Sequence, residues 1–259
     1  MSARVCPSLR LSGALTVDAG ASLFRGTSLG MNTPGTISSA SILLNNNTPP
    51  LTGGAAPAGH PSIGIIRGAF GDTSASGLGT QLVTYDFDKG IRLLNPNTEY
   101  TTTLNNGSAV TDNVKMDGLG VFLPNATTAN ALWLSNGGSI SGSGLLTLTA
   151  GNLLVTGSGN NVFNPITAGA NALAVGGPGN VTLHAPVSGS GGLIKQGDGT
   201  LTLNTANTHT GATVLAAGTV AVANASAFRN TEVQFQGGEI RNGTGSLLTL
   251  ANNLTAPAR

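Results

Sequence analysis

The residues of this chain that are best suited to chemistry include one serine in a glycine-flanked motif. Gly26-Thr27-Ser28-Leu29-Gly30 matches the nucleophile elbow of hydrolases, in which a strand before the serine and a helix after it hold the hydroxyl in place. The sequence that follows, MNTPGTISS, has no helical pattern, and in a chain with 39 glycines the motif is expected to arise by chance. We therefore expect Ser28 not to act as a nucleophile.

Three aspartates suggest metal binding by their spacing. Asp86 and Asp88 are two residues apart, but Asp88 begins a turn sequence, Asp-Lys-Gly, and no further oxygen ligands follow at the spacing of a calcium loop. Asp198 lies between two glycines, as in the calcium-binding nonapeptide repeats of some β-helices, yet those repeats need an aspartate in every nine residues. We expect Asp86 to be a strand residue, Asp88 a turn residue and Asp198 an isolated aspartate, and we expect no metal site.

The basic residues also lack the spacing of a site. His60, His184 and His209 do not have metal-ligand spacing, although the last two are 25 residues apart and would stack if one coil of chain separated them. We expect all three on the surface. Lys195, one of three lysines, is expected to point into solvent and to keep the protein soluble.

Polysaccharide lyases and hydrolases need clustered carboxylates, which are scarce here. Residues 119–197 contain no Asp or Glu, and only Asp198, Glu232 and Glu239 lie beyond them. Glu232 and Glu239 are expected on separate walls of the fold. The sequence therefore predicts no enzyme: no catalytic, cofactor-binding or metal-binding residues, and no cofactor. The alternative is a carbohydrate-active enzyme with a site within residues 60–120, which a close carboxylate pair in a groove would favour.

Composition excludes several classes of protein. Only 8% of the residues are charged, against about 25% in an average soluble protein, and the net charge is +1. Such a chain cannot bind nucleic acid through its phosphates. It contains no apolar run long enough for a transmembrane helix, so we expect no membrane insertion by this segment. Cys6 is the only cysteine, which excludes an intrachain disulfide. A hydrophobic content of 39% argues against disorder.

The second half of the chain alternates apolar and polar residues in short stretches separated by Gly, Asn, Ser or Pro. Alternation of this kind predicts strands, and larger units recur about every 20 residues, which is typical of a solenoid. An immunoglobulin-type sandwich also has closely spaced strands, but it usually has more aromatic core residues. The predicted strands are residues 132–135, 145–149, 152–156, 172–175, 181–184, 200–204, 219–223, 232–236 and 247–251.

The first half is less regular. Residues 15–24 have the pattern of one coil, the proline-rich residues 32–64 are expected to form a loop or insertion, and residues 81–94 are expected to form a hairpin around Asp88-Lys89-Gly90. We therefore predict an irregular, loop-rich β segment with partial coils over residues 1–130 and a repeat-containing β-helix over residues 131–259.

One stretch resembles a known repeat. Residues 193–203 read Leu-Ile-Lys-Gln-Gly-Asp-Gly-Thr-Leu-Thr-Leu, followed by Asn-x-His-x-Gly-x-Thr from Asn207 to Thr213 and by Gly218-Thr-Val220. This resembles the passenger-associated repeat of autotransporters, also called the autotransporter-associated β-strand repeat, with His209 in place of the usual tyrosine. Residues 134–157 and 233–255 are looser matches in the same style.

The resemblance implies an all-β fold, a right-handed parallel β-helix, and a bacterial surface protein. The implied function is structural and adhesive: a rigid stalk or fibre that displays loops on the cell exterior, anchored in the outer membrane through sequence not present here. Its implied partners are a surface carbohydrate or another ligand on a host or neighbouring cell. Because the chain stops within repeat-like sequence, we also expect copies to associate end to end.

Overall fold

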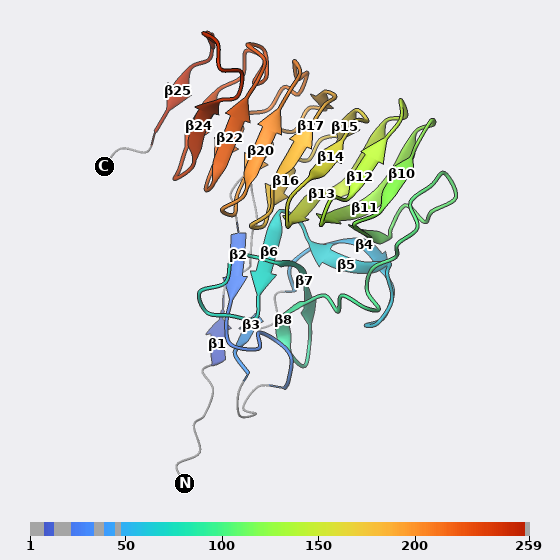
Figure 1. Cartoon of the computed structure of the whole chain (residues 1–259). Coiled ribbons are helices and arrows are strands. Elements are labelled where there is room, and N and C mark those ends of the chain that lie inside the picture. Colours follow the sequence, from blue (N-terminus) through green and yellow to red (C-terminus); the bar gives the residue numbers. More distant parts are fainter. Residues whose placement is uncertain (1–7, 13–21, 34–38, 45–47, 257–259) are drawn as a thin grey trace.

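The computed structural model describes residues 8–12, 22–33, 39–44 and 48–256, and these residues form strands, turns and loops without any helix. It follows that the described residues hold no helix able to cross a membrane. Figure 1 shows two parts: a long stack of parallel strands from the green to the red end of the chain, and a smaller group of strands from its blue and cyan portion. The all-β prediction is confirmed.

The stack is a β-solenoid of about 7 turns. One of its walls is a seven-stranded sheet in which every pair of neighbours is parallel and the strand order follows the chain. This parallel stacking is the arrangement that the 20-residue recurrence predicts. The strands of this sheet are β10 (Gly120–Phe122), β12 (Ser139–Ser141), β14 (Asn160–Val162), β17 (Val181–Leu183), β20 (Thr200–Leu203), β22 (Thr219–Val222) and β24 (Glu239–Asn242).

The other walls belong to a ten-stranded sheet, also parallel throughout. Its long strands β11 and β13 run along two walls, so the predicted strands 145–149 and 152–156 are one strand. The members are β9 (Asn113–Asp117), β11 (Thr127–Ser135), β13 (Leu146–Thr156), β15 (Ile166–Thr167), β16 (Leu173–Gly176), β18 (Val187–Ser188), β19 (Leu193–Lys195), β21 (Thr213–Leu215), β23 (Val233–Phe235) and β25 (Leu254–Thr255).

Successive coils repeat after about 20 residues, with steps of 19 to 22 between paired positions. Leu173 pairs with Leu193, Leu193 with Thr213, and Thr213 with Val233, so each step along this column advances the chain by 20 positions. The recurrence read from the sequence is therefore the length of one coil. Because the strands are in register, side chains that point inward in one coil lie over inward side chains of the next.

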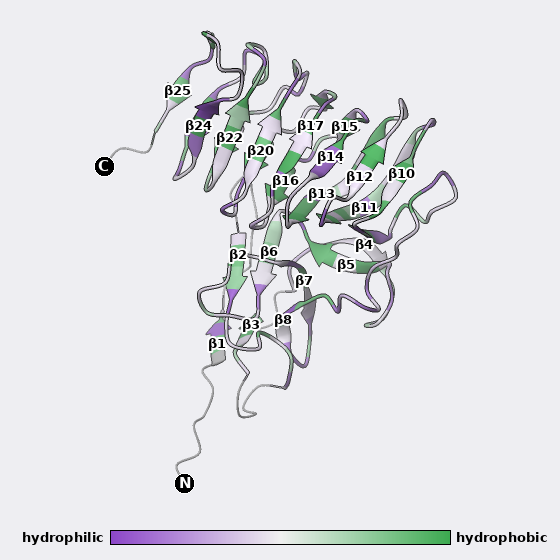
Figure 2. Ribbon diagram, in the orientation of Figure 1, coloured by the Kyte–Doolittle hydropathy of each residue, from purple (hydrophilic) through white to green (hydrophobic). Residues whose placement is uncertain are grey.

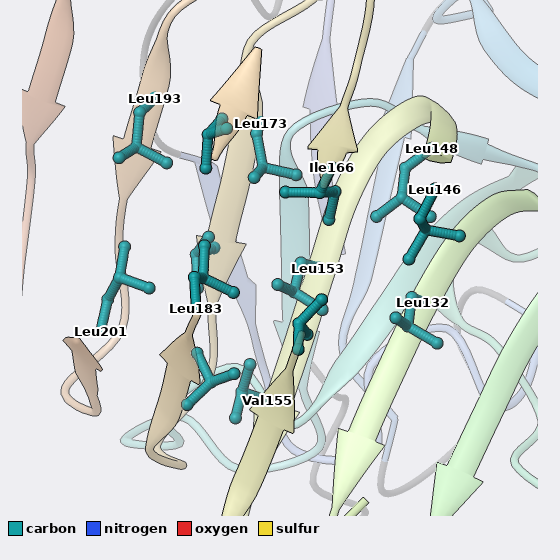
Figure 3. Packing of buried hydrophobic residues seen from close by; sticks show 14 of the residues in the cluster. Leu132, Leu146, Leu148, Leu153, Val155, Ile166, Leu173, Leu183, Leu193 and Leu201 are labelled. Atoms are coloured by element: carbon teal, nitrogen blue, oxygen red, sulfur yellow. The ribbon is translucent and has the colours of Figure 1, made fainter. Parts of the chain in front are cut away.

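Aliphatic side chains fill the interior of the solenoid. Figure 3 shows Leu173, Leu183, Leu193 and Leu201 pointing toward one another from neighbouring strands, and all four are buried. They belong to a continuous cluster that extends along the stack from Leu104 to Val233. A single coil cannot bury these groups alone, and stacking removes them from water at about 25 cal/mol per Å² of apolar surface.

Glycine forms corners where one coil passes close to the next. A Cβ atom added to Gly199 would lie 1.8 Å from the carbonyl oxygen of Gly179 in the preceding coil, and one added to Gly191 would lie 1.8 Å from that of Asn171. Gly197 has a φ of +70°, which residues with a side chain rarely adopt. These corners explain the glycine content of the repeat-like sequence.

The N-terminal part contains a four-stranded sheet and two strand pairs. The sheet has the order β2-β6-β7-β8, and its β7–β8 pair is antiparallel around residues 87–89, which confirms the predicted hairpin. Two strands lie within residues 32–64 and a third begins at Ile63, so the prediction of a loop there is wrong in part; residues 34–38 and 45–47 lie outside the described residues. The strands are β1 (Ser8–Leu11), β2 (Ser22–Arg25), β3 (Ser41–Leu44), β4 (Leu51–Ala55), β5 (Ile63–Ile66), β6 (Ala69–Asp72), β7 (Gln81–Asp86) and β8 (Gly90–Leu93).

This part packs against the outer surface of the ten-stranded sheet. Phe70 lies so close to Gly176 that an added Cβ would meet its ring at 2.5 Å. The amide of Asn152 accepts from the Gly68 nitrogen at 2.8 Å and donates to the Ala69 carbonyl at 3.1 Å. The Gln196 side chain donates to the Gly68 carbonyl at 2.8 Å. Apolar packing and buried hydrogen bonds therefore join the two parts.

The strand predicted at residues 247–251 is absent, and the coil predicted at residues 15–24 is described only in part. Residues 247–251 do not form a strand; Leu247 is almost fully exposed, and the next pairing partner of β23 is β25, a few residues later. Most of the coil predicted at residues 15–24 lies outside the described residues, and its final residues form the start of β2.

Replacing Gly199 with alanine is expected to lower the free energy of unfolding by about 1–3 kcal/mol, because the new methyl group would collide with the backbone of the adjacent coil. Gly120→Ala is the matched control, since no heavy atom lies within 4 Å of a Cβ added there. Urea denaturation followed by circular dichroism measures both. Equal unfolding midpoints for the two variants would contradict this account of the corners.

Candidate functional site

A cavity of about 520 Å³ lies in the N-terminal part and contains the main charged cluster of that region. Its wall includes Lys89 and Arg92 from the β7–β8 hairpin and Glu99 from the segment after β8. The sequence places a possible carbohydrate-processing site within residues 60–120, and this cavity is the structural feature that best fits that alternative.

Arg92 and Glu99 form a two-pronged ion pair at the cavity wall. Both terminal nitrogens of Arg92 donate to the Glu99 carboxylate, each at 2.8 Å. The side chains are buried, with 10% and 2% of their surface exposed. Asp86 lies on the other side of the guanidinium, with its Oδ2 atom 3.8 Å from Nε. Two carboxylates thus approach one buried cation.

The Glu99 carboxylate is too well satisfied to act as a general acid. It also accepts hydrogen bonds from the backbone nitrogens of Gly59 and Asn95, both at 2.7 Å. Burial by itself would raise the pKa of Glu99, but the hydrogen bonds from Arg92, Gly59 and Asn95 together hold that pKa below its ordinary value. A glycosidase acid needs the opposite shift, because it must carry a proton near neutral pH. The geometry is that of a structural ion pair.

The two aspartates of the hairpin have the roles expected from the sequence. Asp86 ends β7, and its Oδ1 atom accepts from the backbone nitrogens of Asp88 and Lys89 at 2.9 and 3.1 Å. Asp88 is exposed in the turn. Among the described residues, no group of three or more His, Cys, Asp or Glu side chains is placed to hold a metal ion.

Within the described ranges of the chain, the Ser28 hydroxyl makes no side-chain hydrogen bond to a general base. Ser28 follows β2 and has a φ of 51°, but the chain continues into turns and not into a helix. Its carbonyl accepts from the Ser39 hydroxyl at 2.8 Å, and its nitrogen donates to the Thr73 carbonyl at 2.9 Å. The positive φ therefore belongs to a turn fixed by backbone contacts.

Lys195 is buried, so the prediction of a solvent-facing side chain is wrong. It is 2% exposed, and its Nζ atom donates to the carbonyls of Gln196 and Gly197 at 2.9 and 2.6 Å and lies 3.5 Å from that of Ala217. The ammonium group satisfies carbonyls that a tight corner leaves without strand partners. Burial lowers the pKa of Lys195 to about 8, while exposed Asp198 acts in the opposite direction.

His209 is also buried, against the prediction that all three histidines lie on the surface. Its Nε2 atom is 3.1 Å from the Thr213 hydroxyl, and Nδ1 has no hydrogen-bond partner among the residues that the structure describes. Burial, with the nearby Arg229 charge, lowers the pKa of His209 to about 4. His60 is exposed, as predicted. His184 does not stack on His209; it stacks on Phe163 instead.

The remaining acidic residues are apart, as the sequence predicts. Glu232 immediately precedes β23 in the ten-stranded sheet, whereas Glu239 begins β24 in the seven-stranded sheet. Glu232 is held by the Gln234 amide and the Thr255 hydroxyl, both at 2.9 Å. The two carboxylates therefore belong to different walls and do not form a pair.

A second cavity, of about 370 Å³, lies on the outer surface of the ten-stranded sheet beside the docked N-terminal part. Ala174, Ile194 and Val214 form its apolar floor, and Arg67 and Asn171, which are hydrogen-bonded to each other, lie at its edge. It holds one cation and no carboxylate among its lining residues. Sequence reasoning missed this cavity because the surface is completed by residues more than 100 positions apart.

The buried histidine makes stability depend on pH. The unfolded chain binds a proton at His209 near pH 6.5 and the folded chain only near pH 4, so stability falls as the pH drops through this interval. The expected loss from this residue is up to about 3 kcal/mol. Urea unfolding at pH 7, 5.5 and 4.5 should show a shallower pH dependence for His209→Gln than for His60→Gln. Identical pH dependence of the unfolding free energy in both variants would refute the role of His209 in the pH dependence.

The comparison with known families finds a match within the solenoid. The family model of the passenger-associated-transport-repeat matches residues 193–222, which run from β19 to β22 and include the Lys195 corner. No curated protein and no solved structure matches the chain. The match covers the stretch that the sequence analysis identifies, and within it His209 and Lys195 are buried parts of the coil. Together, the repeat and the β-solenoid fit the passenger region of an autotransporter.

Proposed function

We propose that this chain is a structural, non-catalytic segment of an autotransporter passenger: a rigid stalk that lies outside the bacterial cell and supports adhesion. The observation that carries the proposal is the unbroken parallel stack, in which one coil follows another in register through the residues that match the repeat. A shape of this kind extends in one direction and buries its core continuously.

Contacts between coils support the rigidity. Each central strand is hydrogen-bonded on both sides, so bending the stack would break backbone pairs as well as apolar packing. Buried asparagines add further links. Asn164 donates to the carbonyls of Leu123 and Gly144 at 3.0 and 2.8 Å, and Asn207 donates to the Ala227 carbonyl at 2.6 Å. These side chains join residues 20 or more positions apart along the axis.

The N-terminal part supports a display role. It is held on the wall of the solenoid by Phe70 and by the hydrogen bonds of Asn152 and Gln196, so its loops are fixed relative to the stalk. Exposed Phe87 at the tip of the β7–β8 hairpin is one group that such a part presents to the surroundings. Adhesion to a surface carbohydrate or to a ligand on another cell would use groups of this sort.

The alternative is a carbohydrate-active enzyme, and the cavity with Arg92 and Glu99 is what favours it. A carboxylate pair within reach of a groove is present there, but both carboxylates face a buried guanidinium, and Glu99 is held ionised. The structural role explains more of this geometry than catalysis does. Association of copies end to end stays a prediction.

Glu99→Gln separates the two functions. If the pair is structural, the variant loses about 3 kcal/mol of unfolding free energy, because the buried Arg92 charge keeps only the longer contact with Asp86. Asp88→Asn, an exposed carboxylate on the same hairpin, should change stability by less than about 0.5 kcal/mol. Reducing-end assays on neutral and acidic polysaccharides should show no turnover for either form. Turnover by the native chain that disappears in Glu99→Gln would establish the alternative.

Antibodies raised against the purified chain are expected to label intact cells of the bacterium that makes it, and external protease is expected to abolish the signal. The reason is the proposed location outside the cell. An antibody against a cytoplasmic protein serves as control and should label only permeabilised cells. Labelling of this chain that also requires permeabilisation would overturn the proposed location.

A further inference from the structure

The outer surface of the seven-stranded sheet carries a row of aromatic and polar side chains across five coils. Phe122 pairs with Ser141, and the pairing of Ile140 with Val162 places Phe163 next in line. His184 and Asn204 continue the line, because their backbone nitrogens bond to the carbonyls of Val162 and Leu183 at 2.8 and 3.1 Å. We call the residues Phe122, Ser141, Phe163, His184 and Asn204 the aromatic row.

The row concentrates exposed phenyl rings. Phe122 is 69% exposed and Phe163 is 45% exposed. Among the described residues only one other phenylalanine, Phe87 on the distant hairpin, is classed as exposed. Single exposed apolar residues need no explanation, but two in the same column, two strands apart, form an organised feature.

One of these rings is held in a fixed orientation. The Phe163 and His184 rings are stacked with centroids 4.1 Å apart and planes 6° from parallel. The imidazole is itself held from both sides: Nε2 lies 2.9 Å from the Asn161 Oδ1 atom, and Nδ1 lies 3.1 Å from the Asn204 amide nitrogen. These contacts assign the proton to Nε2. Since the stack runs along the axis of the solenoid, the free face of Phe163 is turned toward the strand that carries Ser141.

Ser141 separates the two phenylalanines with a short side chain. Its hydroxyl donates to the Val121 carbonyl at 3.1 Å and so lies along the sheet. Strands in a sheet are about 4.8 Å apart, which puts Phe122 and Phe163 about 9.6 Å apart at the backbone. Carbon atoms in contact are about 3.5–4.0 Å apart, so one flat ring, and not two, fits between them.

A parallel row of hydroxyl and amide groups accompanies the aromatic row. Ser139, Asn161, Thr182 and Thr202 point outward on successive strands, as the half-buried positions between the buried ones show. Within the described part of the chain, the hydroxyls of Ser139, Thr182 and Thr202 make no side-chain hydrogen bond. They are free to bind the hydroxyl groups of a ligand.

Charge restricts the ligand to a neutral one. Residues 118–194, which supply the first four strands of this sheet, contain no Asp, Glu, Lys or Arg. The first formal charges on the sheet are those of β24, at its far end. Figure 2, which is coloured by hydropathy, shows both β24 and β14 in purple, but β14 contains asparagines and no charged residue. A phosphate, sulfate or uronate group would find no cation here. The two rings are also separated by serine, so they do not form the contiguous apolar patch that marks many protein-binding surfaces.

We propose that the aromatic row binds one pyranose ring of a neutral oligosaccharide, over Ser141 and against the free face of Phe163, with Phe122 on its other side. A pyranose ring has a flat side of C–H groups, which suits the negative face of an aromatic ring, and hydroxyls at its edge, which suit the row of Ser139, Thr182 and Thr202. His184 is a positioning residue that fixes Phe163. The proposal rests on the adhesive function above, because it names the class of ligand.

Calorimetric titration of the whole chain with cellohexaose, β-1,4-mannohexaose and maltohexaose tests it. At least one is expected to bind with a Kd of about 1 mM or tighter, and Phe163→Ala and Phe122→Ala are each expected to weaken that binding at least tenfold. Phe87→Ala is the matched control, an exposed phenylalanine outside the row, and should leave the Kd unchanged. Thermal unfolding verifies that each variant is folded. If Phe163→Ala does not fold, the test depends on the sugar affinity of Phe122→Ala, because Phe122 is the more exposed of the two residues.

Three outcomes would overturn the proposal: no binding of any neutral hexasaccharide, equal binding by the native chain and Phe122→Ala, or tighter binding of hexagalacturonate. A change of mass in light scattering on Phe163→Ala, without a change in sugar binding, would assign the row to contacts between copies and also overturn it. If no sugar binds in the titration but antibodies label intact cells, the sugar-binding role of the aromatic row is rejected and the proposed location of the protein stands. If a sugar binds but antibodies label only permeabilised cells, the proposed location outside the cell is rejected and the sugar site stands.

Discussion

In-register stacking of parallel strands is the constraint on which the rest of this structure depends. Once Leu173, Leu193, Thr213 and Val233 follow one another at the spacing of one strand, every position of a coil meets the equivalent position of the next. Inward positions must then be buried in every coil, either apolar or, like Thr213, polar with a buried partner, and corners must be small in every coil. The Gly199 corner, which has no room for a methyl group, is a direct result of that repetition.

The same constraint accounts for the scarcity of charge. Two like charges in neighbouring coils would lie about 4.8 Å apart, at a cost of about 1 kcal/mol even in water, and a column would multiply that cost. Neutral groups gain from stacking instead. Asn164 and Asn207 use their amides to bond carbonyls of adjacent coils, and Lys195 enters the corner where carbonyls converge. With 8% charged residues, the composition is that of a stacked protein.

The sequence predicts the solenoid well and its polar details poorly. Alternation and the 20-residue period are local signals, so β17, β20 and β22 lie close to where the sequence places them. The sequence predicts Lys195 and His209 on the surface, and both are buried, because a sequence shows residue type but not which carbonyls or hydroxyls face a corner. The docking of Phe70 on Gly176 joins residues more than 100 positions apart, a distance over which no pattern in one sequence carries information. The aromatic row likewise exists only once the register aligns Phe122 with Phe163.

The 20-residue step between equivalent positions also has a genetic consequence. A duplication or deletion of 60 nucleotides between Leu193 and Val233 would rejoin the chain at the same point of the coil, with the next strand still in phase and the same wall facing outward. Such events change the number of coils and leave the design of each coil intact, since within the stack each coil contacts only its neighbours; only the contacts with the docked N-terminal part, such as that of Gln196 with Gly68, depend on which coil is lost. Selection for a longer or shorter protein can therefore act through unequal recombination, whereas an insertion of a few residues would displace every later strand unless a corner absorbed it.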